Sequence, residues 1–432
     1  MRKLLALLLA TVLMLSLVPA ALAQGAAPIT IELWHTRGSG ANAEAMTTQV
    51  KTFNETVGKE KGIQVVDTFQ GGYVDALTKY MNAVAAGEPP ELVVLERAAG
   101  VPVMAEEGVL ADLTPYVEAS GLDMDNFAQI LLAYSYDSEG KLIALPYIRS
   151  TPVLYYNKTM LDAAGLTAPA TIDEMIEAGR KLYKKDEATG EAQVYGFELH
   201  NDPAWFLQNW LVQLGSNMFS EDGLTVPALE DGTMLKVFTA WRSWVDEGWC
   251  APFVSTNATD VMTELFMNNK LGMFFQSSGS MANILKQAEA AGIEVGVSFL
   301  PTWDKPAAPT GGGNISIIER GNSKEAIDAA WEFMYFLMSN EQVAYNSITS
   351  GYLPTTKTSV ETQAMKDHWA ARPQYKVPFE QLNIAQEIPY SPYKSDVETA
   401  WRQVCSLLIQ DRSIDAQQAV DQLAEECSVI LP

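Results

Sequence analysis

The sequence YIRSTPVLYYNK, residues 147–158, decides the fold of this chain. Residues 153–156 form a short apolar and aromatic run that is typical of a buried strand. Pro152 requires extended backbone at the residue before it. A polar Arg-Ser-Thr step that leads into such a strand, near the middle of a long α/β sequence, indicates a crossover between two lobes with Arg149 and Ser150 in the cleft. The alternative, which periodicity alone favours, is an ordinary interior strand whose serine and threonine bond neighbouring backbone groups.

Strands and helices alternate in the part of the chain before this stretch. The predicted strands are 29–34, 63–69 and 91–95, and the predicted helices are 41–54 and 73–86. This alternation predicts a parallel sheet that is covered by helices. In open sheets of this kind, ligands bind beyond the carboxyl ends of the strands. Polar, aromatic or glycine residues follow all three strand ends, at 34–37, 70–73 and 96–97.

More strands and helices follow the crossover, and a return crossing is indicated near residues 301–313. The predicted helices are 159–165, 171–184, 234–247 and 323–338, and the predicted strands are 195–199, 271–275, 295–300 and 314–318. Thr171 and Glu174 have the spacing of a capping box. The serine-rich loop 276–280 precedes a helix that begins near Met281, and the free N–H groups of such a helix end favour an anion.

Residues 1–23 have the pattern of a secretory signal peptide. Arg2 and Lys3 give a basic start, residues 4–18 an apolar segment, and residues 21–23 a small-residue cleavage box. No cysteine follows this box, so we expect a protein without a lipid anchor. We therefore expect export across the inner membrane to a periplasmic or other extracytoplasmic location.

The 432-residue chain is strongly acidic. Loss of Arg2 and Lys3 with the signal peptide changes the formal net charge from −24 to −26. This charge argues against a partnership with nucleic acid or with an anionic membrane surface. A small anionic ligand stays compatible with it, because the local field of a pocket can oppose the field of the whole protein.

The cysteines and histidines predict neither a cofactor nor a metal site. An oxidising compartment allows a disulfide between Cys405 and Cys427 and leaves Cys250 as a buried thiol. The three histidines are scattered, and the cysteine spacing fits no zinc pattern. The chain also lacks the common hydrolase and nucleotide-binding motifs. We expect a binding protein, and a secreted hydrolase is a distant alternative.

Aromatic, glycine and polar residues at strand ends and loops are candidate ligand contacts. Aromatic rings at Trp34, Tyr73, Trp205 and Tyr352 can stack on a sugar or enclose a quaternary ammonium, although core or rim packing is the better explanation for any single one of them. Gly312 and Gly313 allow backbone N–H groups to approach a ligand closely, or they simply form a flexible loop. Arg149, Ser150 and the 277–280 loop combine charge with hydrogen-bond donors, as a phosphate site requires, and a surface acid is the alternative partner of the arginine.

Several motifs in order along the chain carry a family resemblance. The stretches STPVLYYNK, LWHT, GGYVDAL, SSGSMANI, GGG and GYLP resemble motifs of the extracellular solute-binding proteins of ABC importers. The first and fourth are similar in particular to the branch that binds glycerol-3-phosphate, whereas GYLP is shared with sugar binders. The similarity extends through most of the chain that follows the signal peptide.

The resemblance implies a set of ligand residues. By motif these are Tyr73, Glu96, Ser150, Ser278 or Ser280, Gly313 and Tyr352, with Trp205 in the position of a tryptophan that covers the ligand. The family also places an arginine late in the chain against the phosphate, and Arg402 lies about one helical turn from the matching position. Arg37 and Arg149 stand where the family pattern has uncharged residues. We expect Arg149 to meet the phosphate and Glu96 to accept hydrogen bonds from the glycerol hydroxyls.

The resemblance also implies the architecture and the function. The expected fold is α/β, a two-lobed type II periplasmic-binding-protein fold in which each lobe is a mostly parallel sheet flanked by helices. Lobe 1 comprises residues 24–146 and 301–345, and lobe 2 comprises residues 147–300 and 346–432. The expected function is ligand capture by hinge closure and delivery to an inner-membrane ABC permease by a monomeric protein. The expected ligand is glycerol-3-phosphate or a glycerophosphodiester, and a neutral oligosaccharide is the alternative.

Overall fold

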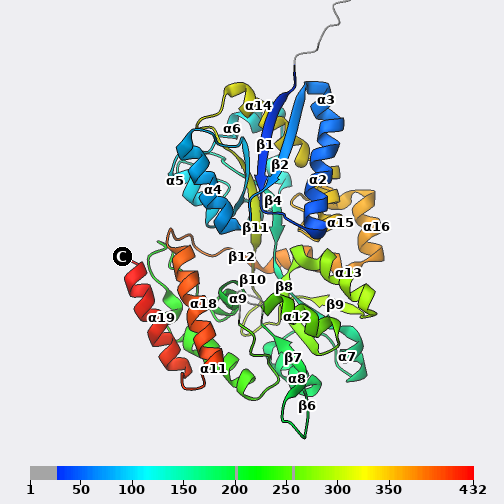
Figure 1. The fold of residues 1–432 in the computed structure, drawn as a ribbon, viewed down its shortest axis with the longest axis vertical. Helices are drawn as coiled ribbons and strands as arrows, with labels where there is room; N and C mark the ends of the chain where they lie inside the picture. Colours follow the sequence, from blue (N-terminus) through cyan, green and yellow to red (C-terminus); the bar gives the residue numbers. More distant parts are fainter. Residues whose placement is uncertain (1–26, 200–202, 255–257) are drawn as a thin grey trace, which may run out of the picture.

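The computed structural model describes residues 27–199, 203–254 and 258–432, so the predicted signal peptide lies outside the described residues. Two lobes lie one above the other, and each has its own sheet flanked by helices (Figure 1). In the described ranges, no helix combines the length and the apolar character needed to cross a membrane. The predicted two-lobed α/β fold is confirmed.

The first lobe, at the top of Figure 1, is built on a five-stranded sheet of order β2-β1-β3-β11-β4. Its strands are β1 (Ile29–His35), β2 (Ile63–Phe69), β3 (Leu92–Glu96), β4 (Leu145–Ser150) and β11 (Gly311–Ile317). Its helices are α2 (Gly40–Glu55), α3 (Val57–Lys61), α4 (Tyr73–Ala86), α5 (Gly100–Glu106), α6 (Thr114–Ser120), α14 (Lys324–Leu337) and α15 (Asn340–Ser350). Strand β3 is apolar on both faces because both are covered. Leu92 and Val94 pack in the cluster with α2 and α14, whereas Val93 and Leu95 pack with α4 and α5.

The second lobe is built on a five-stranded sheet of order β6-β7-β8-β5-β9. Its strands are β5 (Pro152–Asn157), β6 (Lys184–Lys185), β7 (Ala192–Glu198), β8 (Leu271–Ser277) and β9 (Val295–Ser298). The helices around it and at the lobe junction are α7 (Lys158–Ala163), α8 (Ile172–Leu182), α9 (Pro203–Gln213), α10 (Pro227–Glu230), α11 (Thr233–Asp246), α12 (Ala258–Met267), α13 (Met281–Ala291), α16 (Gln363–Ala371), α17 (Val377–Gln381), α18 (Lys394–Gln410) and α19 (Ala416–Ile430). Leu154 of β5 faces the cluster with α8, α9, α11 and α18, and its neighbours Val153 and Tyr155 face α12 and α13. The crossover stretch therefore supplies a central strand buried on both faces.

Each sheet contains parallel and antiparallel pairs of strands. In the first sheet β1 is parallel to β2 and β3, but β11 lies antiparallel between β3 and β4. In the second sheet β7 and β8 are parallel, but β5 lies antiparallel to both β8 and β9. Strands β5 and β11 each enter their sheet from the other lobe. They therefore start at the edge where their neighbours end, and this reverses their direction.

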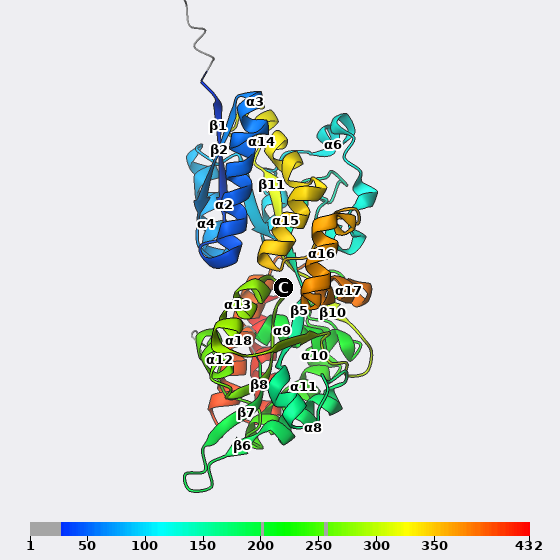
Figure 2. The ribbon, with the colours of Figure 1, turned by 90° about the vertical axis from the view of Figure 1, so that its right-hand side faces the viewer.

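Three chain segments pass between the lobes. The first is the step from β4 to β5 at Thr151, and the second contains β10 (Ala308–Pro309) and leads into β11. The third lies before β12 (Ala385–Gln386) in the chain, and β12 pairs with β10 as a two-stranded ribbon between the lobes (Figure 1). In the view of Figure 2, α16 and α17 also lie at this junction, and α13 lies below α2 and α15.

The third passage begins later in the chain than residue 346. Thr356 forms a β-bridge with Phe127, so this segment remains with the first sheet. Tyr352 packs in the same apolar cluster as β1 and β3. Tyr375, in contrast, packs in the cluster of β5 and α13. We therefore place the passage between Thr356 and Tyr375, and assign residues 346–356 to the first lobe.

Two local features concern the predicted helix cap and the disulfide that the sequence allows. The capping box at the start of α8 is confirmed: the Thr171 hydroxyl oxygen accepts from Glu174 N at 3.2 Å, and the Glu174 carboxylate accepts from Thr171 N at 3.3 Å. Cys250, Cys405 and Cys427 are buried thiols, and no disulfide joins the last two.

Candidate ligand-binding site

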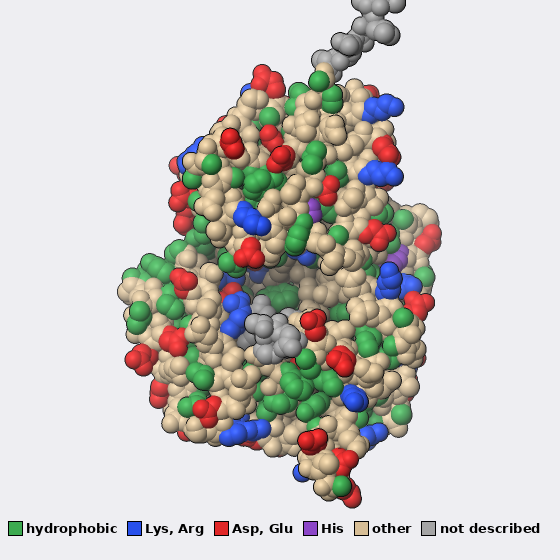
Figure 3. Space-filling view, viewed as in Figure 1, with side chains coloured by type: hydrophobic (Ala, Val, Ile, Leu, Met, Phe, Trp, Pro, Cys, Tyr) green, Lys and Arg blue, Asp and Glu red, His purple; other side chains and the backbone are tan. Residues whose placement is uncertain are grey.

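A cavity of about 600 Å³ lies between the lobes, where strand ends of both sheets meet. Figure 3 shows the molecule hollowed between its upper and lower parts, with Lys or Arg side chains at the left of the hollow. The first lobe contributes the loops after β1, β2 and β3, and the second contributes α9, α18 and the serine loop after β8. The cavity therefore lies at the carboxyl ends of the first parallel strands, as the sequence predicts.

Arg37 reaches the cavity from the loop after β1. Its Nη1 donates a hydrogen bond to the Tyr352 hydroxyl, and its Nη2 donates to the Tyr73 hydroxyl at 2.7 Å. Its Cζ atom lies 5.4 Å from the ring centroid of Tyr73 and 5.1 Å from that of Tyr352, within the range of cation–π attraction. Two rings from separate segments thus hold the guanidinium in one position.

Arg37 has hydroxyl partners but no countercharge. Among the described residues, no carboxylate oxygen lies within 4.0 Å of its guanidinium, and its buried Nε–H has no hydrogen-bond acceptor. Burial lowers the pKa of Arg37, but the oxygens of Tyr352 and Tyr73 outweigh this, and the pKa is raised overall. A fixed cation with a spare donor and no carboxylate partner suits an anionic ligand.

Glu96 brings a carboxylate to the same wall, at the end of β3. Its Oε2 accepts hydrogen bonds from the backbone N–H groups of Ala98 and Ala99, at 2.9 and 2.5 Å. These bonds fix the carboxylate, while its Oε1 receives no hydrogen bond from any described residue and is able to accept one from a ligand hydroxyl. Burial raises the pKa of Tyr73 well above its usual range, so the Tyr73 hydroxyl keeps its proton beside this carboxylate.

The second lobe presents three charged side chains from one face of α18. Lys394 Nζ lies 2.9 Å from Glu398 Oε1, and Arg402 Nη2 lies 3.3 Å from Glu398 Oε2. The spacing of four residues places the three side chains one above another along the helix. Glu398 thus compensates part of the positive charge on this wall. Arg37, on the other wall, has no such carboxylate partner among the described residues.

The floor of the cavity is formed where the lobes join. The Trp205 ring lies over Gly311, where a Cβ atom would come within 2.7 Å of the ring and 3.2 Å of the Ser150 hydroxyl. Gly312 has a φ of +84°, and a Cβ atom there would lie 2.0 Å from the carbonyl oxygen of Ile148. These two positions require glycine because strands and an aromatic ring pack tightly at the crossing.

The structure brings seven of the ten predicted site residues to the cavity wall. These are Tyr73, Glu96, Ser150, Trp205, Ser280, Tyr352 and Arg402. Ser278 and Gly313 lie behind the wall instead. The Ser278 hydroxyl is fully buried and accepts from Thr151 N at 3.3 Å. Gly313 lies inside β11, where a Cβ atom would come within 2.9 Å of the Tyr73 hydroxyl.

Arg149 is also absent from the cavity wall, which corrects the expectation that it faces the ligand. Its side chain is fully buried, and its guanidinium donates to the carbonyl oxygens of Gly311 and Leu131 and to the side-chain oxygens of Asn314 and Thr310. Arginine stands at this position because the crossing strands leave carbonyl oxygens that need a donor. These partners come from segments distant in sequence, so no local pattern reveals them.

The cavity residues that sequence reasoning missed include Lys394 and Glu398. Together with Arg402 they follow an i, i+4, i+8 pattern on one helix, and this spacing was the available signal. The aromatic ring of Tyr352 also lies against the serine loop of the second lobe, where a Cβ atom at Gly279 would come within 2.5 Å of it. The small residues of that loop therefore allow the two lobes to approach.

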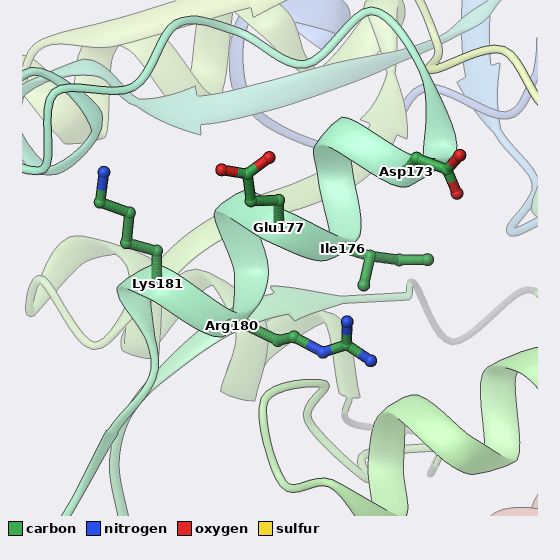
Figure 4. A pocket seen from close by; sticks show the side chains of 5 residues that line it. All are labelled: Asp173, Ile176, Glu177, Arg180 and Lys181. Carbon is green, nitrogen blue, oxygen red and sulfur yellow. The ribbon is translucent and has the colours of Figure 1, made fainter.

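A second hollow, on the outer face of α8, differs in kind from the cavity. Figure 4 shows that all five side chains that line it project from this single helix: Asp173, Ile176, Glu177, Arg180 and Lys181. Arg180 is engaged there in an exposed, two-point ion pair with Glu247, at 2.6 and 2.8 Å. This hollow is an open surface feature and converges no groups from separate elements.

The comparisons with known proteins agree with this geometry. The sn-glycerol-3-phosphate-binding periplasmic protein UgpB of Agrobacterium fabrum is 27% identical over 369 residues, which cover 82% of this chain and 80% of that protein. The crystal structure of UgpB from Mycobacterium tuberculosis with glycerophosphocholine has a TM-score of 0.78 and 23% identity, and covers 94% of this chain and 98% of that one. The GacH receptor of Streptomyces glaucescens, solved without ligand and with acarbose, has a TM-score of 0.79 and 21% identity, and covers 94% and 98%.

The two solved structures show that the fold is shared, since their sequence identity to this chain is low. The sequence model that describes a bacterial extracellular solute-binding protein matches residues 48–373, which is most of the chain and includes segments of both lobes. On this match, and on a cavity built between two lobes, the chain belongs to the family of bacterial extracellular solute-binding proteins.

Proposed function

We propose that this protein captures glycerol-3-phosphate or a glycerophosphodiester outside the cytoplasmic membrane and delivers it to an ABC permease. The observation that carries the ligand class is Arg37, a cation at the cavity wall with no carboxylate within 4.0 Å among the described residues. A relative is named for sn-glycerol-3-phosphate, and a structure of the same fold holds glycerophosphocholine. These names support the proposal from outside the chain.

The phosphate group accounts for the arrangement around Arg37. An anion that leaves water for a cavity needs a cation or several donors, because an unpaired buried charge is costly. Arg37 is already held by Tyr73 and Tyr352, so little side-chain entropy is lost when the anion binds. The hydroxyl of Ser280 and the backbone of Gly311, at the cavity wall, are additional contacts of the kind that phosphate oxygens use.

The glycerol end of the ligand needs acceptors, and Glu96 provides one. Its carboxylate is fixed by two backbone N–H groups and keeps Oε1 for a hydroxyl donor. Separation of the carboxylate from the phosphate avoids repulsion between the two anions. Arg37 and Glu96 thus suit opposite ends of one small polar molecule.

Transport follows from capture. The lobes are joined by three chain segments, so they close on the ligand by a hinge motion. We propose that residues 1–23 are a signal peptide, that the exported chain carries no lipid anchor, and that it acts as a monomer. The net charge of −26 after removal of Arg2 and Lys3 also disfavours nucleic acid as a partner.

A neutral oligosaccharide is the second candidate ligand. Trp205 is half-buried at the cavity wall, and aromatic rings of this kind stack on sugar rings. The cavity, at about 600 Å³, has room for more than one sugar ring. The structurally similar GacH receptor was solved with acarbose.

A thermal-unfolding panel tests the proposal. The protein without its signal peptide is mixed with glycerol-3-phosphate, glycerophosphocholine, inorganic phosphate, maltose and maltotriose. A ligand at about 100 times its Kd stabilises the folded state by about 2.7 kcal/mol, which raises Tm by a few degrees. We expect the two glycerol phosphates to raise Tm and the two sugars to leave it unchanged. The reverse result would replace the glycerol phosphate proposal with the oligosaccharide one.

A further inference from the structure

A cluster of three charged side chains is buried where the lobes join. Arg97 follows β3, Arg149 lies in β4, and Glu387 directly follows β12. Glu387 Oε2 lies 2.8 Å from Arg97 Nη1, and Glu387 Oε1 lies 3.6 Å from Arg149 Nη2. The side chains of Arg97 and Arg149 are only 4% and 0% exposed. Two buried cations therefore share one carboxylate.

Thr310 completes the cluster from the second crossing segment. Its hydroxyl accepts from Arg149 Nη2 at 2.6 Å and donates to Glu387 Oε1, and its carbonyl oxygen accepts from Arg97 Nε at 3.2 Å. The members come from the end of β4, from the second crossing segment, from the residue after β12 and from the loop after β3. The cluster is thus a built feature of the junction and cannot shift as a surface ion pair can.

The cluster carries one unit of positive charge in excess. The other partners of Arg149 are uncharged carbonyl and amide oxygens of Leu131, Gly311 and Asn314. Burial, together with the Arg97 cation, lowers the pKa of Arg149 to about 10, so Arg149 is charged at neutral pH. Among the described residues, Glu387 is the only acid within 4.0 Å of either arginine.

The excess charge is placed where a ligand feels it. Arg97 lines the cavity, and Arg149 lies directly behind the wall, where it bonds the carbonyl of cavity-lining Gly311. The nearby carboxylate of Glu96 is held by backbone N–H groups and forms no ion pair with Arg97 within 4.0 Å among the described residues, but its charge favours the protonated form of both arginines and so offsets part of the excess from a longer distance. A buried charge without a full countercharge favours an anion nearby, because charges interact strongly where water is excluded.

We propose that the Arg97–Glu387–Arg149 cluster selects ligands by charge: its excess positive charge is balanced by the anionic group of the bound ligand. The proposal rests on the proposed function, since a neutral ligand brings no such group. It assigns selectivity to Glu387 and Arg149, which do not touch the ligand and act through the field of the cluster. Arg37 and the cluster then have different roles. Arg37 forms hydrogen bonds with the anionic group, and the cluster favours the ligand with the more highly charged anionic group.

Two variants of opposite charge test the cluster. Glu387→Gln raises its net charge by one, and Arg149→Met lowers it by one. The probes are glycerol-3-phosphate, whose monoester phosphate is mostly dianionic at pH 7.5, and glycerophosphocholine, a zwitterion whose diester phosphate carries one negative charge and whose choline group carries one positive charge. We expect Glu387→Gln to lower the Kd of glycerol-3-phosphate about tenfold and that of glycerophosphocholine threefold or less, and Arg149→Met to raise them by similar factors.

The matched controls are Glu247→Gln and Arg180→Met, which make the same charge changes in the exposed ion pair on α8. We expect these two variants to leave both Kd values unchanged. Thermal unfolding reports whether each cluster variant folds. A single folded cluster variant is sufficient for the test, because the readout is the ratio of its Kd values for the two ligands. A purely structural role would change both Kd values by the same factor.

An unchanged ratio in a folded cluster variant would overturn this proposal and leave the proposed function intact. A ratio that moved in the same direction in both variants would overturn it as well. Wild-type protein that bound neither glycerol phosphate would end the proposed function, and this inference with it.

Discussion

The two walls of the cavity carry positive charge in different ways. On the first lobe, Arg37 is held by tyrosine hydroxyls and has no carboxylate within 4.0 Å among the described residues. On the second lobe, Lys394 and Arg402 lie on either side of Glu398, at 2.9 and 3.3 Å. A count of cations would favour the second wall as the anion site. The first wall is nevertheless the better anion site, because no carboxylate within 4.0 Å among the described residues offsets the charge of Arg37. This difference can be tested residue by residue.

The largest effect is expected from Arg37→Gln. Removal of one partner of a buried, hydrogen-bonded charge pair costs roughly 2–5 kcal/mol. Calorimetric titration should therefore show that the binding free energy for glycerol-3-phosphate is weakened by roughly this amount. Arg180→Gln, a charge loss of the same size on the outer face of α8, is the control and should leave the Kd unchanged. Equal affinities for Arg37→Gln and wild type would show that the first wall does not meet the phosphate.

A smaller effect is expected from Trp205→Ala. The loss of its ring from the cavity wall should weaken binding by about 1–2 kcal/mol. Trp303→Ala serves as the comparison, because the Trp303 ring packs against Trp210 and Trp244, with centroids 5.7 and 6.3 Å apart, in the core cluster of the second lobe. Trp303→Ala should lower Tm more than Trp205→Ala does, and it should weaken ligand binding less. Equal losses of affinity in the two variants would contradict the assignment of Trp205 to the ligand.

The second wall should respond weakly and with opposite signs. Lys394→Gln should weaken glycerol-3-phosphate binding by less than about 1 kcal/mol, since Glu398 already offsets part of the charge. Glu398→Gln should strengthen binding by a similar amount, since it removes the carboxylate that offsets the charge of Lys394. A loss from Lys394→Gln as large as that from Arg37→Gln would reverse the comparison between the walls.

The smallest effect is a dependence on pH. The second ionisation of a phosphate monoester lies near pH 6, and a nearby arginine favours the dianion, so wild-type affinity for glycerol-3-phosphate should rise between about pH 5 and pH 7 and then level off. The expected rise is roughly 0.5–1 kcal/mol. It should be smaller in Arg37→Gln, and it should be absent for glycerophosphocholine, whose diester has no second ionisation. A rise of equal size for the diester would assign the titration to the protein instead.

Local features of the fold were predictable from the sequence. The strand 63–69 and the helix 73–86 have the predicted ends, because each is an uninterrupted pattern bounded by turn residues. The capping box of α8 depends on two residues three apart, so it too can be recognised locally. The direction of β5 and β11 was not predictable from such patterns, since it follows from which lobe each strand comes from.

The site, like the fold, has features that local sequence predicts and features that depend on distant segments. Tyr73 and Glu96 stand at strand ends, so the rule for parallel sheets brings them to the cavity. Arg149 also lies near a strand end, so the same rule predicts that it reaches the cavity. It is buried instead, because Leu131, Thr310 and Asn314 supply acceptors from elsewhere in the chain. Arginine partners depend on three-dimensional neighbours, and a single sequence does not reveal them.

The crystal structure of the protein with glycerol-3-phosphate tests the central claim most directly. We expect the phosphate between the closed lobes, with an oxygen within hydrogen-bond distance of the Arg37 guanidinium, and a glycerol hydroxyl that donates to Glu96. A phosphate held by Lys394 and Arg402 and remote from Arg37 would contradict the claim that the uncompensated wall binds the anion.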